Sequence, residues 1–181
     1  MKVLILAADG VEDLELFYPL YRFKEQGFEV DVAGPKAGPI TGKHGYTIEA
    51  DLSFDDIDAE DYDMLFLPGG KGPETVRLSD KAVSVTRQMF EAGKCVAAIC
   101  HGAQILVSAG VIEGKRATCW AGVRDDIRAA GANYRDEEVV IDGNLITSRQ
   151  PDDLPAFCRA IFEMVGAEST AAASGRWSSS L

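Results

Sequence analysis

The sequence predicts an α/β fold in which helices cover both faces of a mostly parallel central sheet. Apolar, strand-like runs alternate with segments of helical periodicity along residues 1–166, which is typical of strands joined by crossover helices. Apolar strands of this kind are expected where both faces of a sheet are buried. The chain has 181 residues, of which 46% are hydrophobic and 26% charged, so we expect a single domain with a substantial core over residues 1–166.

The N-terminal part of the chain contains three predicted strands, at residues 2–8, 28–33 and 64–67. A helix between the first two carries apolar side chains at roughly helical spacing, namely Leu14, Phe17, Tyr18, Tyr21 and Phe23. Gly27 is expected to end this helix, because glycine tolerates positive φ. Residues 34–50 are rich in glycine and proline, which predicts a loop with short strand pieces around Ile40 and at 46–48.

The C-terminal part continues the alternation of strands and helices. Helices are predicted at residues 80–92, after Cys100 as far as Gly110, and at 123–130, and strands at 95–99 and 117–120. Residues 139–141 and 145–148 flank Asp142-Gly143-Asn144, a turn sequence typical of a β-hairpin.

A last amphipathic helix is predicted from Phe157, Ile161, Phe162 and Val165, with Asp152 or Asp153 as its N-cap. From residue 167 to 181 the composition shifts to alanine, serine and threonine. This segment is expected to be a flexible tail or a remnant of cloning rather than a second domain.

Composition argues against several classes of function. The net charge is −11 and no cluster of lysine and arginine is visible, which disfavours nucleic acid and anionic membranes as partners. No apolar run approaches the ~18 residues that span a bilayer, and the N-terminus lacks a signal-peptide pattern. The cysteines and histidines lack metal-ligand spacing, so we expect free thiols in a reducing cytoplasm and no metal. These residues are Cys95, Cys100, Cys119, Cys158, His44 and His101.

Cys100 is the strongest candidate for a chemical role. The strand-like run at 95–99 ends at this cysteine, and His101, Gly102 and a helical pattern follow at once. A sharp strand-to-helix turn lifts the residue at the turn clear of the sheet, as in a nucleophile elbow. The N–H groups and dipole of the new helix should favour the thiolate of Cys100, which is the nucleophilic form. The alternative is a cysteine that is simply the last core residue of its strand.

Two further predicted strand ends should meet Cys100, because ligands bind beyond the carboxyl ends of the strands in open α/β sheets. Glu12 follows the first strand. When protonated it could donate a hydrogen bond to the thiolate; the alternative is that its carboxylate only interacts favourably with the dipole of the first helix. After the 64–67 strand come Gly69 and Gly70, whose N–H groups could form an oxyanion hole with that of His101, or only a tight turn.

His101 is the expected general base, and such a base needs a third group to orient it. The local acidic candidates are Asp9, Glu74, Asp125 and Asp126. The residues by themselves do not choose among these four.

Together these motifs resemble the PfpI-type (ThiJ/PfpI) intracellular protease and deglycase family of the class I glutamine amidotransferase-like superfamily, over roughly residues 1–166. The resemblance lies in Val11-Glu12-Asp13, Thr41-Gly42-Lys43-His44-Gly45, Leu67-Pro68-Gly69-Gly70, Ala98-Ile99-Cys100-His101-Gly102 and Ser148-Arg149. It implies a flavodoxin-like three-layer αβα sandwich with Cys100 as nucleophile, His101 as base and Glu12 as the partner of the thiol. It also implies that Glu74 completes the site from a neighbouring subunit of a homodimer or hexamer.

Trp120 departs from the tyrosine that is common beside the nucleophile in close relatives, and its expected role is an aromatic wall of the pocket. Glutamine amidotransferase activity is disfavoured, because those domains carry a distant His-Glu pair and no histidine follows His101 here.

Three functions remain open at this point. The first is a cofactor-free cysteine hydrolase that acts as a deglycase or glyoxalase on dicarbonyl adducts, as the resemblance implies. The second is an ATP-independent intracellular cysteine peptidase. The third is a redox-sensing stress chaperone, because an exposed, acidic thiol oxidises readily. A small carbonyl compound or a peptide is therefore the expected substrate.

Overall fold

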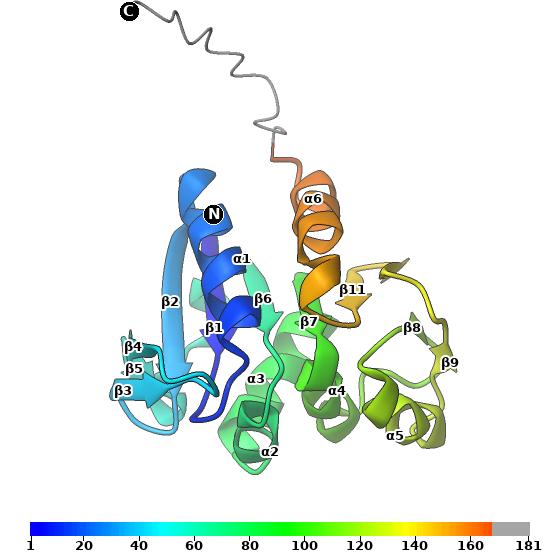
Figure 1. Ribbon diagram of the computed structural model, residues 1–181, viewed down its shortest axis with the longest axis horizontal. Helices are drawn as coiled ribbons and strands as arrows, with labels where there is room; N and C mark the ends of the chain where they lie inside the picture. The colour runs from blue at the N-terminus through cyan, green and yellow to red at the C-terminus, as the bar shows by residue number, and fades with distance from the viewer. Residues whose placement is uncertain (168–181) are drawn as a thin grey trace, which may run out of the picture.

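The computed structural model describes residues 1–167, and a seven-stranded sheet runs through their centre in the order β10-β11-β7-β6-β1-β2-β5 (Figure 1). All neighbouring strands are parallel except the β10–β11 hairpin. The strands are β1 (Lys2–Leu6), β2 (Glu29–Gly34), β5 (Leu52–Ser53), β6 (Met64–Leu67), β7 (Cys95–Ile99), β10 (Val139–Asp142) and β11 (Leu145–Ser148).

Helices cover both faces of this sheet and divide the core into two halves. Helices α1 (Asp13–Glu25) and α6 (Leu154–Met164) bury their apolar sides on one face. The other face is covered by α2 (Gly72–Val76), α3 (Asp80–Glu91), α4 (Ala103–Ala109) and α5 (Arg124–Ala129). Successive residues of β1 alternate between the two halves, with Ile5 on the α1 side and Leu4 on the α3 side. The predicted three-layer αβα fold is therefore confirmed.

Two small sheets lie outside the central one. Strands β3 (Gly38–Thr41) and β4 (Thr47–Ala50) form an antiparallel hairpin within the predicted 34–50 loop. Strands β8 (Arg116–Ala117) and β9 (Asn133–Tyr134) form a short parallel pair. The predicted 117–120 strand was thus placed slightly too late, and the short elements α2, β5 and β9 were not predicted.

The start of the last helix differs from the prediction in its chemistry. Asp153 occupies the N-cap position of α6, but its side chain caps no backbone N–H. Both of its oxygens instead accept from Arg149, at 2.9 and 3.1 Å. A guanidinium offers two charge-assisted hydrogen bonds and so outcompetes a neutral backbone donor.

The winding of the sheet reverses between β1 and β6. From β1 the chain continues to β2 on one side, whereas β6 continues to β7 on the other. In open α/β sheets, ligands bind at the carboxyl ends of the strands where the direction changes. The loops after β1, β6 and β7 therefore converge at one place.

No helix among residues 1–167 is long and apolar enough to cross a membrane. The predicted tail lies outside the described residues from position 168 onward.

Candidate active site

Cys100 stands at a strained turn between β7 and α4. Its φ is 60°, which makes it the single non-glycine residue with positive φ in the described part of the chain. Holding such a residue costs on the order of 1–3 kcal/mol, so the surrounding structure must enforce it. Gly102 contributes to this, because a Cβ at that position would collide with the carbonyl oxygen of Leu67. The predicted strand-to-helix turn is therefore present at Cys100, but the residue is buried, with 7% of its surface exposed.

His101 lies directly against this sulfur. Its Nδ1 is 3.2 Å from the Cys100 Sγ, and its half-buried ring stacks on Trp120 with a centroid distance of 6.5 Å. Burial lowers the pKa of His101, while the charge of Glu74 opposes this effect. The imidazole is therefore neutral near neutral pH and can accept a proton from the thiol.

Glu15 supplies the carboxyl group beside the thiol, a role that the sequence analysis missed. It is fully buried in α1, its carboxyl and the Cys100 thiol influence each other's pKa, and it accepts from the Gly69 N–H at 2.8 Å. Burial, as the main cause, raises the pKa of Glu15 to about 7. The signal was present in the spacing, because Glu15 stands within the buried stripe of α1, next to Leu16 and four residues before Pro19.

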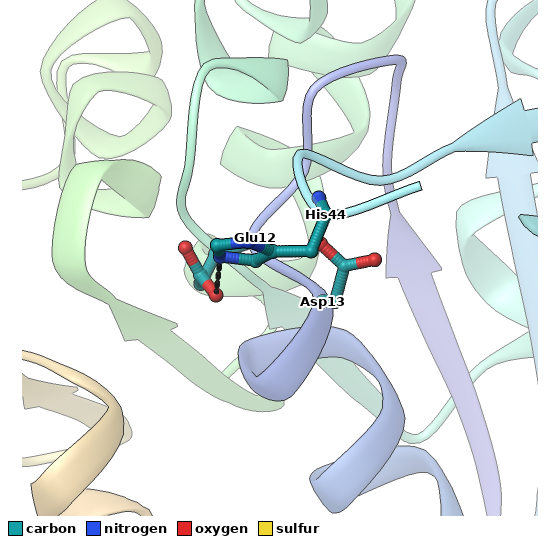
Figure 2. A group of neighbouring side chains, drawn as sticks. All are labelled: Glu12, Asp13 and His44. Atoms are coloured by element: carbon teal, nitrogen blue, oxygen red, sulfur yellow. Dashed lines mark hydrogen bonds and ion pairs between the residues drawn. The ribbon is translucent and has the colours of Figure 1, made fainter. Parts of the chain in front are cut away.

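Glu12, the predicted partner of the thiol, lies at the rim of the pocket instead. Its Oε2 is 3.3 Å from Lys43 Nζ. Its Oε1 is 3.4 Å from His44 Nε2, the contact drawn in Figure 2. The reason is its position as N-cap of α1: the helix begins after it, and the face toward the sheet is reached only at Glu15. The acid that meets Cys100 is thus one helical turn later than expected.

The predicted oxyanion hole is changed in one member. The backbone N–H groups of Gly70 and His101 face the Cys100 sulfur and favour its anionic form. The N–H of Gly69 is already donated to Glu15 and is not free for an oxyanion. Two of the three predicted donors therefore remain in position to bind a developing negative charge.

Burial dominates the acidity of Cys100. It raises the pKa of the thiol to about 12, and the negative charge of Glu15 adds to the rise. The expected lowering of the Cys100 pKa by the helix N-terminus is thus outweighed, first by burial and then by the Glu15 charge. Because thiol and carboxyl lie in one desolvated space, the pair carries at most one negative charge near neutral pH, and a proton on Glu15 favours the thiolate.

These groups line one pocket of about 460 Å³. It is open to solvent, and Trp120 in its lining is 40% exposed. Its lining residues are Glu12, Glu15, Lys43, His44, Gly70, Cys100, His101, Trp120 and Pro151. The other cysteines are also buried thiols, but none of them lines this pocket.

The four acidic candidates for orienting His101 are placed differently. Asp9 accepts from the backbone N–H of Thr41, and Asp125 pairs with Arg124 and Arg128. Glu74 influences the pKa of His101 through its charge, yet within residues 1–167 it forms no hydrogen bond or ion pair with the ring. Asp126 likewise forms no hydrogen bond or ion pair with His101 within residues 1–167.

Glu12, Asp13 and His44 offer three possible metal-ligand atoms within 4.8 Å of one another (Figure 2). Both oxygens of Asp13 already accept backbone N–H groups, from His44 at 2.8 Å and Tyr46 at 3.2 Å. The Lys43 ammonium beside Glu12 also opposes a cation. These contacts are better described as a clamp that holds the 41–46 turn on α1.

Comparison with known proteins places the chain among proteins of the same architecture. Residues 1–164 match the sequence model of the DJ-1/PfpI family. Deglycase TK1284 of Thermococcus kodakarensis is 57% identical over 165 residues, covering 91% of this chain and 99% of that protein. The putative cysteine protease YraA of Bacillus subtilis is 41% identical over 159 residues, covering 87% of this chain and 94% of that protein.

A solved structure agrees with these matches. A two-domain protein of Anabaena variabilis, with DJ-1/ThiJ/PfpI-like and ferritin-like domains, has a TM-score of 0.89 and 40% identity to this chain. The match covers 91% of this chain and 48% of that protein, so the chain spans about half of its length.

Proposed function

Because this chain belongs to the DJ-1/PfpI family, as its motifs predicted, we propose that it is a cofactor-free cysteine hydrolase that acts as a deglycase or glyoxalase on dicarbonyl adducts. Relatives named deglycase and putative cysteine protease support a hydrolase at the coarser level. The geometry of the pocket supports the more specific assignment.

One observation carries the proposal: the Cys100 sulfur lies between the imidazole of His101 and the buried carboxyl of Glu15, in a pocket open to solvent. A nucleophile, a proton acceptor and a group able to hold the nucleophile as an anion are thus in contact. A structural cysteine needs neither neighbour, as Cys158 illustrates with its burial among apolar residues.

The proposed reaction begins when the sulfur attacks the aldehyde carbon of methylglyoxal; an adduct reacts in the same way once it has released its thiol or amine and regenerated the free aldehyde. The thiol proton passes to His101, and the resulting alkoxide is bound by the N–H groups of Gly70 and His101. A proton then moves from the aldehyde carbon to the neighbouring ketone carbon through an enediol, leaving a thioester on Cys100. Water hydrolyses the thioester, so that methylglyoxal and water yield lactate with no external oxidant or reductant.

Glu15 is assigned the role that was predicted for Glu12. A protonated Glu15 donates a hydrogen bond to the Cys100 thiolate. Because it is then neutral, it does not repel the negative charge of the sulfur. The raised pKa of Glu15, about 7, supports this role, because a substantial fraction of the carboxyl is protonated at neutral pH.

A neighbouring subunit completes the proposed site. We assign Glu74 to orient the His101 of a partner copy in a homodimer or hexamer, since Glu74 is exposed on α2 and makes no direct contact with the ring within the described residues.

Peptidase activity is the second candidate, and a relative named putative cysteine protease favours it. A pocket of about 460 Å³ suits a small electrophile better than an extended peptide, so we rank it second.

Turnover of methylglyoxal and of its cysteine adduct should be compared with cleavage of short peptide amides. We expect dicarbonyl turnover that falls at least 10³-fold in Cys100→Ser, on the scale of removing a catalytic nucleophile. Peptide cleavage without dicarbonyl turnover would reverse the ranking. Protection of unfolding client proteins by an inactive Cys100→Ser variant would favour the predicted chaperone function.

A further inference from the structure

The β3–β4 hairpin is tied to the start of α1 by a dense set of hydrogen bonds. The backbone of its turn pairs with the loop after β1, from Gly10 N to Thr41 O and from Lys43 N to Val11 O, both at 2.8 Å. The Asp13 carboxylate accepts from the backbone of His44 and Tyr46. The turn is therefore built as a fixed part of the pocket.

Glycine at position 42 makes this close approach possible. A Cβ there would collide with the carboxylate of Asp13. The backbone of the hairpin at Gly42 thus packs directly against Asp13 at the start of α1, although the side chains next to Gly42 are exposed to solvent.

This turn carries Lys43 over the pocket. The Lys43 ammonium is 3.3 Å from Glu12 Oε2, and its side chain is 60% exposed, whereas that of Glu12 is 10% exposed. Figure 2 shows Glu12 and His44 approaching each other from separate segments of the chain. A nearly buried carboxylate is therefore held by a cation that a different segment delivers.

Glu12, the N-cap of α1, and Glu15, three residues later in its first turn, both line the pocket with Cys100. The charged and polar groups that act on Glu15 are Cys100, the Gly69 N–H, Glu12 and Lys43. The Glu12 charge raises the pKa of Glu15, and the Lys43 charge lowers it. The Lys43–Glu12 ion pair at the rim therefore acts on the Glu15–Cys100 pair inside the pocket.

From this arrangement we propose that Lys43 is a positioning residue that holds the Glu12 carboxylate at the rim of the pocket and, with it, controls the charge of the Glu15–Cys100 pair. The proposal rests on the proposed function in assigning Cys100 as the nucleophile. It assigns no contact with substrate to Lys43.

Opposite substitutions test this role. Lys43→Met removes the ammonium beside Glu12 and leaves only His44 in contact with that carboxylate, so it should move the first proton loss of the Glu15–Cys100 pair to higher pH. Glu12→Gln should move it to lower pH, and the double variant should lie near the wild type. A shift of about 0.5–1 pH unit is expected when a charge at the open rim acts on the Glu15–Cys100 pair.

The readout is the rate at which Cys100 is alkylated by iodoacetamide, followed by peptide mass spectrometry between pH 5 and 9. Near pH 6 the shift corresponds to a roughly 3- to 10-fold slower reaction in Lys43→Met and a similarly faster one in Glu12→Gln. The matched control is Lys24→Met, which removes the same charge from the exposed last turn of α1 and should leave the profile unchanged.

Two results would overturn the proposal. One is an unchanged midpoint in both Lys43→Met and Glu12→Gln. The other is a midpoint that moves in the same direction in both, since a merely structural role affects both variants alike.

Failure of the proposed function is detected separately. A wild-type protein without dicarbonyl turnover contradicts that function, yet its alkylation profile still tests Lys43. Normal turnover with an unshifted profile contradicts the role of Lys43 alone.

Discussion

At the scale of single residues, the buried carboxyl of Glu15 is the feature that separates this site from an ordinary protein core. A carboxyl without exposure to solvent is a burden on the fold whenever it is ionised. Its neighbours reduce this burden only in part, through the Gly69 N–H and the Cys100 thiol. Because burial disfavours the ionised form, a proton remains available on Glu15 next to the Cys100 sulfur.

This predicts a stability that depends on pH. Folding raises the pKa of Glu15 from 4.5 to about 7, so the unfolded chain releases this proton first as pH increases. The wild type should therefore lose stability between about pH 4.5 and pH 7, relative to a variant that cannot ionise.

Glu15→Gln should be more stable than the wild type at pH 8, by up to about 3 kcal/mol, and nearly equal to it at pH 4. Urea unfolding at both pH values measures the difference. The variant should also lose activity, because an amide is a weaker hydrogen-bond donor to the thiolate than a protonated carboxyl group. Equal or lower stability of Glu15→Gln at pH 8 would contradict the assignment.

At the scale of elements, the turn from β7 into α4 depends on how closely β6 and α4 approach each other. Gly102 lies against the carbonyl of Leu67, and the ladder between β6 and β7 fixes both strands. A backbone contact of this kind cannot move aside as a flexible side chain could.

Gly102→Ala should therefore displace the elbow. We expect a loss of about 2–4 kcal/mol in the free energy of unfolding, as for strong overpacking, together with a large fall in kcat. Gly27→Ala is the control, because its added Cβ meets no atom within 4 Å. Any loss of stability in this variant comes only from the positive φ of 75°. A Gly102→Ala variant with unchanged activity would show that the elbow tolerates the extra methyl group.

The hairpin formed by β3 and β4 illustrates what an element contributes beyond its own stability. Glycine and proline composition predicted a loop at 34–50 with short strand pieces, and the strands are present. Their function in the pocket follows from docking on α1, which local sequence does not reveal.

At the scale of the whole molecule, the reversal of winding between β1 and β6 gathers three loops at one edge of the sheet. A single chain then supplies the proposed nucleophile, the proposed base, the buried carboxyl and two N–H donors. The exposed position of Glu74 leaves the orientation of His101 to the proposed assembly.

Mixed oligomers test that assembly. Cys100→Ser and Glu74→Gln should each be poorly active alone. If Glu74 acts across an interface, mixing and reassembling the two variants should restore activity, because a Glu74→Gln subunit keeps its Cys100 and receives an intact Glu74 from its partner. The recovered activity should approach the value expected from the number of intact sites that random pairing of the two variants produces.

No recovery, with mixed oligomers shown to form, would place the action of Glu74 within one chain. Full activity of Glu74→Gln alone would remove it from the site. Mass spectrometry of the reassembled species provides the required evidence of mixing.

Sequence by itself was sufficient for the layered fold, the elbow at Cys100 and the convergence of three strand ends, because these follow from periodicity, glycine positions and the direction of parallel strands. Only the tertiary structure decided that Glu15 rather than Glu12 meets the sulfur, and that Gly69 is occupied. The reason is physical: which of two acids, a single helical turn apart, faces the sheet depends on where the helix begins and how it packs. Likewise, Lys43 reaches the pocket only because a distant hairpin docks there.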